Sequence, residues 1–360
     1  MKSKIITMFV AAAAIISGSI DANACTGITL TAKDSTKILA RTIEWGGSDL
    51  NSQYVIVPRG YTAQSYIPNG TDGMKFTAKY GYVGLAVEQK EFIAEGLNEK
   101  GLSAGLFYFP KYGRYEEYNA ENKDNSIADL QLVSLILGEC RNVEEVKNII
   151  EKVHVIAIDP RASTVHWRFA DTTGRQIVLE IIDGKPVFYE NELGVLTNSP
   201  DFNWQMTNLN NYVNLFPGSA PSQKLGNTEL SQFGAGSGFL GIPGDVTPPS
   251  RFVRAAFYQS TAPVLNTSEE TVLQGFQILN NFDIPIGIEF SKNQKPVDIP
   301  SATQWTSATD MNNLKIYFRT MYNSEIRSIS LNEIDFTKVK YRAVPLDKEK
   351  RQPVYNIKIK

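Results

Sequence analysis

Cys25 has the clearest capacity for chemistry, because cleavage of one peptide bond would place it at the start of a chain. It directly follows Ala22-Asn23-Ala24, an Ala-x-Ala pattern typical of signal-peptide cleavage sites. Cleavage after Ala24 would leave 360 − 24 = 336 residues that begin with a free thiol. An N-terminal cysteine combines a nucleophile with a base, since an α-amine with a pKa of about 7.7–8.0 accepts a proton near neutral pH. We therefore expect Cys25 to be an N-terminal nucleophile.

The segment that precedes Cys25 has the layout of a secretory signal. Lys2 and Lys4 come first, an apolar run over 5–16 follows, and small residues lead to the cleavage pattern. The apolar run is too short for a comfortable membrane span. We predict a cleavable signal peptide over 1–24, a single catalytic domain over 25–360, and export to the periplasm or the extracellular space without stable membrane insertion.

Two other interpretations of Cys25 remain open. It could form a disulfide with Cys140, as exported proteins often do, although Cys140 lies in an apolar helical pattern where a free cysteine packs as a small hydrophobic residue. It could also be lipidated, and the chain would then be a lipoprotein or binding module rather than an enzyme.

Arg41 and Glu44 are the charged residues that we expect nearest to Cys25. They lie in the strand-like segment 37–45, which follows the strand-like segment 27–32 across a turn at Asp34-Ser35. Two strands joined by a tight turn lie side by side. A guanidinium beside the thiol would favour the thiolate, and a carboxylate could orient the α-amine.

The histidines and cysteines exclude several other classes of site. The chain has two of each, His154, His166, Cys25 and Cys140, and none has zinc-site spacing, so we expect no metal. A serine hydrolase triad would need one of two histidines that both lie in apolar contexts. We expect catalysis without a histidine base.

The overall charge argues against a nucleic-acid partner. The chain has 36 Lys and Arg against 38 Asp and Glu, with a formal net charge of -2, whereas nucleic-acid binding depends on clustered basic charge. The segment 236–241 matches G-x-G-x-x-G, but no apolar strand precedes it and no helical pattern follows. We therefore predict no dinucleotide or other cofactor.

Blocks of strands alternate with blocks of helices along the chain. Such an order is typical of antiparallel sheets with helices packed outside them, an α+β layered domain. The loop-rich segment 198–250 contains six prolines and is long enough to build a site. Strands are expected over 27–32, 37–45, 54–59, 92–109 (as a hairpin), 164–169, 177–182, 186–189, 315–322 and 326–331. Helices are expected over 127–137 with Ser126 as the N-cap, 143–153 with Asn142 as the N-cap, 251–259 and 269–279.

Six short motifs in order give the chain a specific resemblance. They are Cys25-Thr26-Gly27, Arg41-x-x-Glu44, Asn98-Glu99-Lys100-Gly101-Leu102, Leu196-Thr197-Asn198-Ser199-Pro200, Gly241-Ile242-Pro243-Gly244-Asp245 and Pro249-Ser250-Arg251-Phe252. The set resembles the choloylglycine hydrolase family, which includes bile salt hydrolases and penicillin V acylases. The resemblance extends from Cys25 to about Leu331.

The resemblance implies a fold and a set of site residues. The fold is the four-layer αββα arrangement of N-terminal nucleophile hydrolases, and the reaction is amide hydrolysis through a thioester on Cys25. By the same resemblance, Arg41 flanks the thiol, Asn198 donates its side-chain amide to the oxyanion, and Arg251 stabilises charge. An amide NH₂ suits the oxyanion role because it is a neutral donor.

Two positions depart from the family pattern. Glu44 stands where the family usually has Asp, one methylene shorter, and we still assign Glu44 the hydrogen bond that orients the amine. Tyr108 stands at a position that helps to form the oxyanion hole, where bile salt hydrolases often have Asn and penicillin acylases have Tyr. Its contribution comes partly from the backbone N–H, so a tyrosine there is compatible with activity.

The resemblance also implies a substrate and an assembly. We expect a conjugated bile salt of glycine or taurine as the small-molecule amide substrate, with penicillin V or another N-acyl amide, such as an N-acyl homoserine lactone, as the alternative. Homo-oligomers are expected, with a tetramer as the usual form in the family. The aromatic residues expected to line an apolar pocket are Trp45, Phe107, Phe109, Phe202 and Trp204.

Overall fold

Two large antiparallel sheets form the centre of the molecule. The computed structural model describes residues 23–68, 70–159, 163–291, 293–294, 296 and 298–359, so most of the expected signal peptide lies outside the described residues. The first sheet has the strand order β1 (Asn23–Thr31), β2 (Lys37–Trp45), β16 (Thr303–Asp310), β17 (Lys315–Thr320) and β18 (Asn323–Ser330).

The second sheet has eight strands and packs face to face with the first. Side chains such as Arg41 from β2 reach across to Phe107 in the second sheet, so the interior between the sheets is continuous. Its strand order is β13 (Lys185–Glu190), β12 (Gln176–Ile182), β11 (Val165–Ala170), β8 (Ser103–Tyr108), β7 (Ile93–Asn98), β6 (Tyr82–Ala86), β3 (Gln53–Val57) and β19 (Arg342–Pro345).

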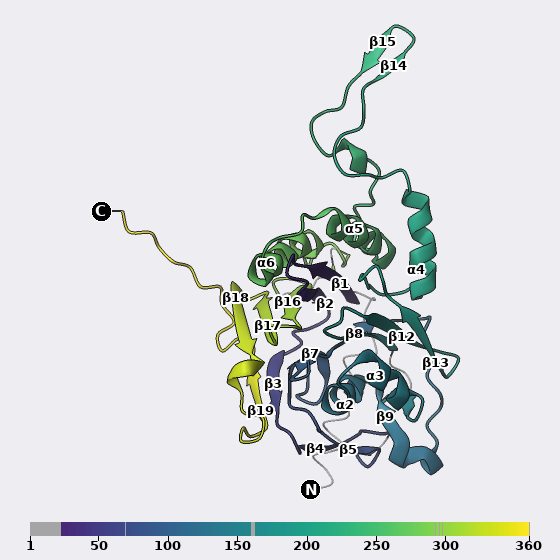
Figure 1. The fold of residues 1–360 in the computed structure, drawn as a ribbon, viewed down its shortest axis with the longest axis vertical. Helices are drawn as coiled ribbons and strands as arrows, with labels where there is room; N and C mark the ends of the chain where they lie inside the picture. The colour runs from purple at the N-terminus through teal and green to yellow at the C-terminus, as the bar shows by residue number, and fades with distance from the viewer. Residues whose placement is uncertain are drawn as a thin grey trace.

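Helices cover the outer face of each sheet (Figure 1). α5 (Pro248–Thr261) and α6 (Ser268–Leu279) pack on β1 and β2, whereas α2 (Leu132–Glu139) and α3 (Val143–Ile150) pack on the second sheet. The layers are therefore helix, sheet, sheet and helix, which confirms the predicted α+β, four-layer αββα fold. A further helix, α4 (Phe202–Asn208), comes after strand β13 of the second sheet along the chain.

Local sequence signals explain two of the helix starts. The Asn142 side chain accepts a hydrogen bond from the Glu145 backbone N–H at 2.9 Å, as expected for the N-cap of α3. Thr267 and Glu270 form a capping box at the start of α6.

The helix expected from Ser126 onward begins later, and this prediction was wrong at its start. Residues Ser126–Ala128 form the short strand β9, which pairs in parallel with β10 (His154–Ile156). α2 begins only at Leu132. Strand pairing with a segment distant in the sequence overrides the local capping signal, and Ser126 donates instead to the Asn122 carbonyl at 2.9 Å.

The loop-rich segment 198–250 contains α4 and a long arm. The arm, residues 213–240, extends away from the layers and ends in the hairpin of β14 (Gln223–Leu225) and β15 (Thr228–Leu230) (Figure 1). Its strands are exposed on both faces. The remaining two-stranded pair is β4 (Thr62–Gln64) with β5 (Lys75–Thr77). Among the described residues, no helix is long and apolar enough to cross a membrane.

Candidate active site

Cys25 lies near the start of β1, buried between the two sheets. Its backbone N–H donates to Asn198 Oδ1 at 2.8 Å, and in the uncleaved chain this nitrogen is still joined to Ala24. The Ala24 side chain lies on the other face of β1, in a small apolar cluster with Ile284 and Ala302. Both cysteines are free, so the structure contains no disulfide between Cys25 and Cys140.

The thiol of Cys25 is surrounded by charges of both signs. Burial raises its pKa above the ordinary value. The positive charges of Arg41 and Arg251 and the backbone N–H of Tyr108 act in the opposite direction, whereas the carboxyl of Glu44 raises the pKa further. The site therefore supplies cationic and hydrogen-bonding groups that offset part of the cost of forming a thiolate in a buried place.

Arg41 lies on the same face of the first sheet as the Cys25 side chain. In the β1–β2 register it is opposite Gly27, two residues after Cys25. Its guanidinium donates to the carbonyls of Ala94 at 3.1 Å and Leu106 at 2.6 Å, and it lies 4.0 Å from the centre of the Phe107 ring. The predicted proximity of Arg41 to Cys25 is thus present, and the arginine is fixed by the neighbouring sheet.

The sequence analysis missed a buried carboxylate, Glu95, that pairs with both Arg41 and a second buried cation, Arg168. Glu95 Oε2 lies 3.5 Å from Arg41 Nη1 and 3.7 Å from Arg168 Nη2, and Ser103 donates to the other carboxylate oxygen at 3.2 Å. Burial lowers the pKa of Arg168 to about 10. Glu95 lies within the expected hairpin 92–109, and a carboxylate buried in a sheet requires a partner. That position was the signal from which its pairing with an arginine could have been predicted.

Glu44 lies on the opposite face of β2 from Arg41, beside Ala24 in the strand register. One carboxyl oxygen accepts from Thr303 Oγ1 at 3.3 Å, and the other has no hydrogen-bond partner among the described residues. Burial raises the pKa of Glu44 to about 8. Its role in orienting the amine of Cys25 stays a prediction.

Asn198 and Arg251 meet at the backbone of Cys25. Arg251, from α5, donates to the Cys25 carbonyl at 2.5 Å, to Thr26 Oγ1 at 2.9 Å and to Asn198 Oδ1 at 2.7 Å. The Asn198 amide nitrogen donates to the Tyr108 carbonyl at 2.7 Å. An amide nitrogen carries two hydrogens, so one remains to donate to an oxyanion. The structure thus brings Cys25, Arg41, Tyr108, Asn198 and Arg251 together and places Glu44 on the opposite face of β2, while the individual roles of all six stay predictions.

The five aromatic residues expected in a pocket occupy different environments. Phe107, Phe109 and Phe202 are buried in the interior, where Phe202 packs edge-on against Phe252. Trp45 is partly buried, with its indole N–H donating to Ser48 Oγ at 3.1 Å, and Trp204 is exposed on α4. Only the two tryptophans have appreciable exposed surface in this structure, and substrate contact by any of the five stays a prediction.

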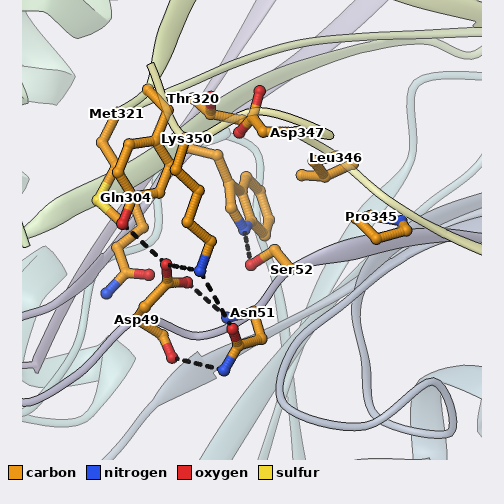
Figure 2. A pocket seen from close by; sticks show the side chains of 12 residues that line it. Asp49, Asn51, Ser52, Gln304, Thr320, Met321, Pro345, Leu346, Asp347 and Lys350 are labelled. Carbon is orange, nitrogen blue, oxygen red and sulfur yellow. Dashed lines mark hydrogen bonds and ion pairs between the residues drawn. The ribbon is translucent and has the colours of Figure 1, made fainter.

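A separate cavity of about 200 Å³ contains none of the predicted site residues (Figure 2). It lies between β16, the β17–β18 turn and the C-terminal segment. Asp49 lines the cavity and accepts hydrogen bonds from Lys350 Nζ at 2.6 Å and from the Tyr322 hydroxyl at 2.8 Å. Because these three polar groups are paired with one another, none of them needs a ligand as a partner.

The sequence over residues 25–343 matches the model of the linear amide C–N hydrolases of the choloylglycine hydrolase type. The chain belongs to the choloylglycine hydrolase family. As a family member it is a hydrolase that acts on linear amide C–N bonds, which confirms both the resemblance and the predicted class of enzyme.

Individual relatives agree with this assignment. The chain is 32% identical over 315 residues to a bile salt hydrolase/transferase of Clostridium perfringens, covering 86% of this chain and 93% of the relative. A crystal structure of a mutant conjugated bile acid hydrolase from Clostridium perfringens superimposes with a TM-score of 0.80 at 29% identity, over 93% of this chain and 100% of that chain. A penicillin V acylase from Agrobacterium tumefaciens shares the fold, with a TM-score of 0.72 at 23% identity, over 90% of this chain and 92% of that chain.

Proposed function

We propose that this chain hydrolyses the amide bond of bile salts conjugated to glycine or taurine, with the thiol of Cys25 as the nucleophile. The arrangement around Asn198 carries the proposal. Its side chain joins the backbone nitrogen of Cys25, the guanidinium of Arg251 and the Tyr108 carbonyl in one buried network. The bile salt hydrolases among its relatives support the choice of substrate.

The proposed reaction begins with removal of residues 1–24, which converts the nitrogen of Cys25 into an α-amine. The amine takes the thiol proton, and the sulfur attacks the amide carbonyl carbon of the substrate. The oxyanion accepts hydrogen bonds, one of them from the remaining N–H of Asn198. Collapse breaks the C–N bond, and the departing glycine or taurine nitrogen takes the proton from the amine.

Water completes the cycle. The neutral α-amine accepts a proton from a water molecule, whose oxygen attacks the thioester carbonyl. The C–S bond then breaks, the free bile acid leaves, and the proton returns to the sulfur. Arg41 and Arg251 stabilise the negative charge that develops near the sulfur and the carbonyl.

Export is the second part of the proposal. The Lys2 and Lys4 residues, the apolar run and the Ala-x-Ala pattern support a cleaved signal peptide and a periplasmic or extracellular enzyme. The intact mass of the exported protein tests this part. A mass that corresponds to residues 25–360 is expected, whereas an added lipid mass on Cys25 would identify a lipoprotein and block the free thiol that the mechanism needs.

Self-association is the third part, with a tetramer as the expected form. The arm presents apolar side chains to solvent, and Phe233 is fully exposed. A second copy of the chain would cover these residues, which are Val213, Phe216, Leu225, Leu230, Phe233 and Leu240. Light scattering of the unaltered protein should give a molar mass that is a multiple of the chain mass. The double variant with Leu230→Ser and Phe233→Ser should have a molar mass closer to that of a single chain. A monomeric mass for the unaltered protein would contradict this part.

Penicillin V or another N-acyl amide is the alternative substrate, because Tyr108 matches the penicillin acylases at that position. The test compares kcat/KM of the mature chain for glycocholate, taurocholate, penicillin V and an N-acyl homoserine lactone, since this ratio measures discrimination between substrates. Cys25→Ala serves as the blank. Preference for the two bile salts is expected, and preference for penicillin V or the lactone would replace the proposed substrate.

A further inference from the structure

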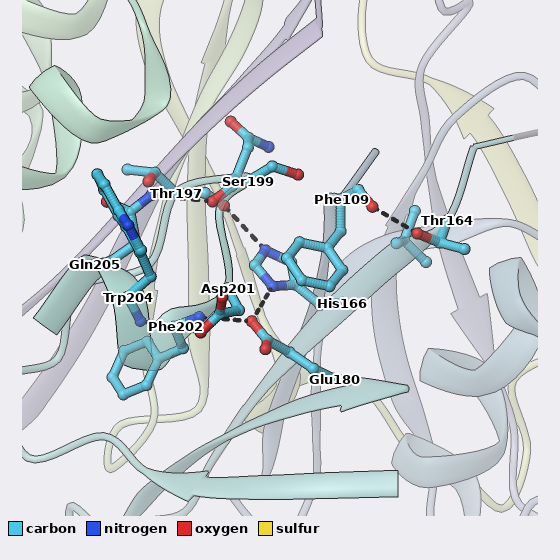
Figure 3. A network of polar contacts seen from close by, with 12 residues as sticks. Phe109, Thr164, His166, Glu180, Thr197, Ser199, Asp201, Phe202, Trp204 and Gln205 are labelled. Atoms are coloured by element: carbon cyan, nitrogen blue, oxygen red, sulfur yellow. Dashed lines mark hydrogen bonds and ion pairs between the residues drawn. The ribbon is translucent and has the colours of Figure 1, made fainter. Parts of the chain in front are cut away.

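His166 is fully buried behind the site, and the proposed reaction does not use it. It lies on β11, opposite Phe107 of β8. Nδ1 lies 3.1 Å from Glu180 Oε1 on β12, and Nε2 lies 3.1 Å from the Thr197 carbonyl oxygen (Figure 3). The imidazole also stacks on Phe109, with 4.3 Å between ring centres and 7° between planes.

Hydrogen-bond chemistry fixes the position of one of the two protons of this pair. A carbonyl oxygen only accepts, so Nε2 must carry the hydrogen that joins it to Thr197. The contact between Nδ1 and Glu180 needs a second hydrogen, which lies either on the ring or on the carboxyl group. Both forms have zero net charge, so the pair tolerates full burial without an unbalanced charge.

The imidazole touches both chain segments that meet at Cys25. Thr197 is the residue before Asn198, and the hydrogen bond from His166 holds the peptide carbonyl from which Asn198 continues. Phe109, on which the imidazole stacks, is the residue after Tyr108. The Tyr108 carbonyl accepts a hydrogen bond from the Asn198 side-chain amide at 2.7 Å. One ring therefore fixes the spacing between the two segments.

Glu180 extends the same restraint to the far end of the Asn198 segment. Its Oε1 also accepts from the Phe202 backbone N–H at 2.9 Å, at the first residue of α4 (Figure 3). Gln205, one turn into α4, donates to the Asn198 carbonyl at 3.3 Å. The segment 197–202 is thus tied at both ends to the His166–Glu180 pair.

We infer that His166 and Glu180 are positioning residues, which hold Asn198 and the Tyr108 segment in place for stabilising the oxyanion at Cys25. The inference rests on the proposed function for its effect on turnover. Attack of the thiol on a simple alkylating agent needs no oxyanion, so the pair should govern amide turnover without governing thiol reactivity.

The test uses Glu180→Gln, which keeps the size of the side chain and one acceptor oxygen but removes the charge or proton that completes the pair. The matched control is Glu116→Gln, which alters the other histidine–glutamate contact, between His154 Nδ1 and Glu116 Oε1 at 2.7 Å in a half-exposed position. His166→Gln is the second variant. Three quantities are measured: kcat and KM with glycocholate, the rate of Cys25 alkylation by iodoacetamide, and backbone hydrogen exchange of a peptide that spans 196–202.

In Glu180→Gln, kcat should fall about 10- to 100-fold, the range expected for loss of a buried charge-assisted hydrogen bond. KM and the alkylation rate should change less than about threefold. Hydrogen exchange over 196–202 should accelerate, and Glu116→Gln should behave as the unaltered chain. Equal losses of turnover and alkylation would indicate general disruption and overturn the inference, as would unchanged turnover in an active enzyme.

The exchange measurement separates this inference from the proposed function. If the unaltered chain hydrolyses none of the substrates, the proposed function fails, and faster exchange over 196–202 in Glu180→Gln still supports the positioning of Asn198. Unchanged exchange in both Glu180→Gln and His166→Gln would overturn it.

Discussion

The Cys25 thiol illustrates how single residues set the chemistry of this site. Burial alone would disfavour the thiolate, and nearby Arg41 and Arg251 counteract that penalty. A hydroxyl in the same place would gain far less, because its proton is held much more tightly and it is a weaker nucleophile. On the proposed mechanism, a serine therefore cannot replace Cys25.

Cys25→Ser should lose nearly all turnover of glycocholate, with kcat lower by at least about 10³-fold. Steady-state kinetics of the mature chain measures this. Cys140→Ser is the control, because Cys140 is buried at the end of α2, away from Cys25. Turnover within tenfold of the unaltered enzyme in Cys25→Ser would contradict the thioester mechanism.

Glu44 should make the stability of the full chain depend on pH. Its pKa is about 8 in the fold against an ordinary 4.5, so between these values the folded state binds more protons than the unfolded state. The free energy of unfolding should therefore fall as pH rises from about 4.5 through about 8, as far as this group is concerned.

Urea unfolding of the full chain and of Glu44→Gln at pH 5, 6.5 and 8 measures this contribution. The neutral amide does not ionise, so the variant should gain stability relative to the unaltered chain as the pH rises. A constant difference across the three pH values would show that Glu44 is ionised in the fold throughout. His154 and His166 are present in both proteins and cancel in the comparison.

At the scale of elements, the β1–β2 hairpin accounts for the part of the site that local sequence predicts. The turn at Asp34-Ser35 and the β-branched runs on either side require Arg41 to lie near Cys25. Asn198 and Arg251 come from a loop and a helix more distant in the chain, so no local spacing predicts them. Only the family resemblance brought these two residues into the predicted site.

Element prediction succeeded where local signals and tertiary contacts agree. The Asn142 cap and the apolar spacing of α3 are one example. β16 was missed because it is a central strand buried on both faces, yet its sequence, TQWTSATD, has no apolar alternation. Some of its polar side chains make tertiary contacts, such as those of Gln304 with the carbonyls of Trp45 and Ser48. Such a strand cannot be recognised before its neighbours are known.

Gly27 should tolerate no side chain, because β1 and the second sheet approach each other closely there. A Cβ on Gly27 would lie 2.8 Å from Arg168 Nη1 and 3.0 Å from Phe107 Cζ. Gly27→Ala should lower the free energy of unfolding by about 1–3 kcal/mol, the usual cost of overpacking. Urea unfolding checks this, with Gly244→Ala as the control, since a Cβ there meets no atom within 4 Å. Equal stabilities for the two variants would disprove the close approach.

For the whole molecule, the order of processing and folding matters. β1 already begins at Asn23, so the fold accommodates residues on the leader side of Cys25. The proposed base exists only after the bond between Ala24 and Cys25 is cut. A chain that retains its leader should consequently fold and yet fail to turn over glycocholate.

A full chain with Ala24→Pro, which blocks cleavage at that bond, provides the test against the mature enzyme. Its kcat should be lower by at least about 10³-fold, since the amide nitrogen cannot accept the thiol proton. Circular dichroism confirms folding of the variant. Turnover comparable with that of the mature enzyme would reveal a base elsewhere in the site.

Ala24 packs against Ile284 and Ala302, so the fold accommodates the residue before Cys25 without cleavage. On the proposed mechanism, this bears on where in the cell the enzyme becomes active. On the proposed mechanism, a single uncut residue silences the catalyst while the rest of the fold is complete. If the leader is removed during export, as we propose, the protease that removes it also activates the enzyme. Newly made molecules would spare the acyl amides of the cytoplasm, and hydrolysis would start only on the far side of the membrane.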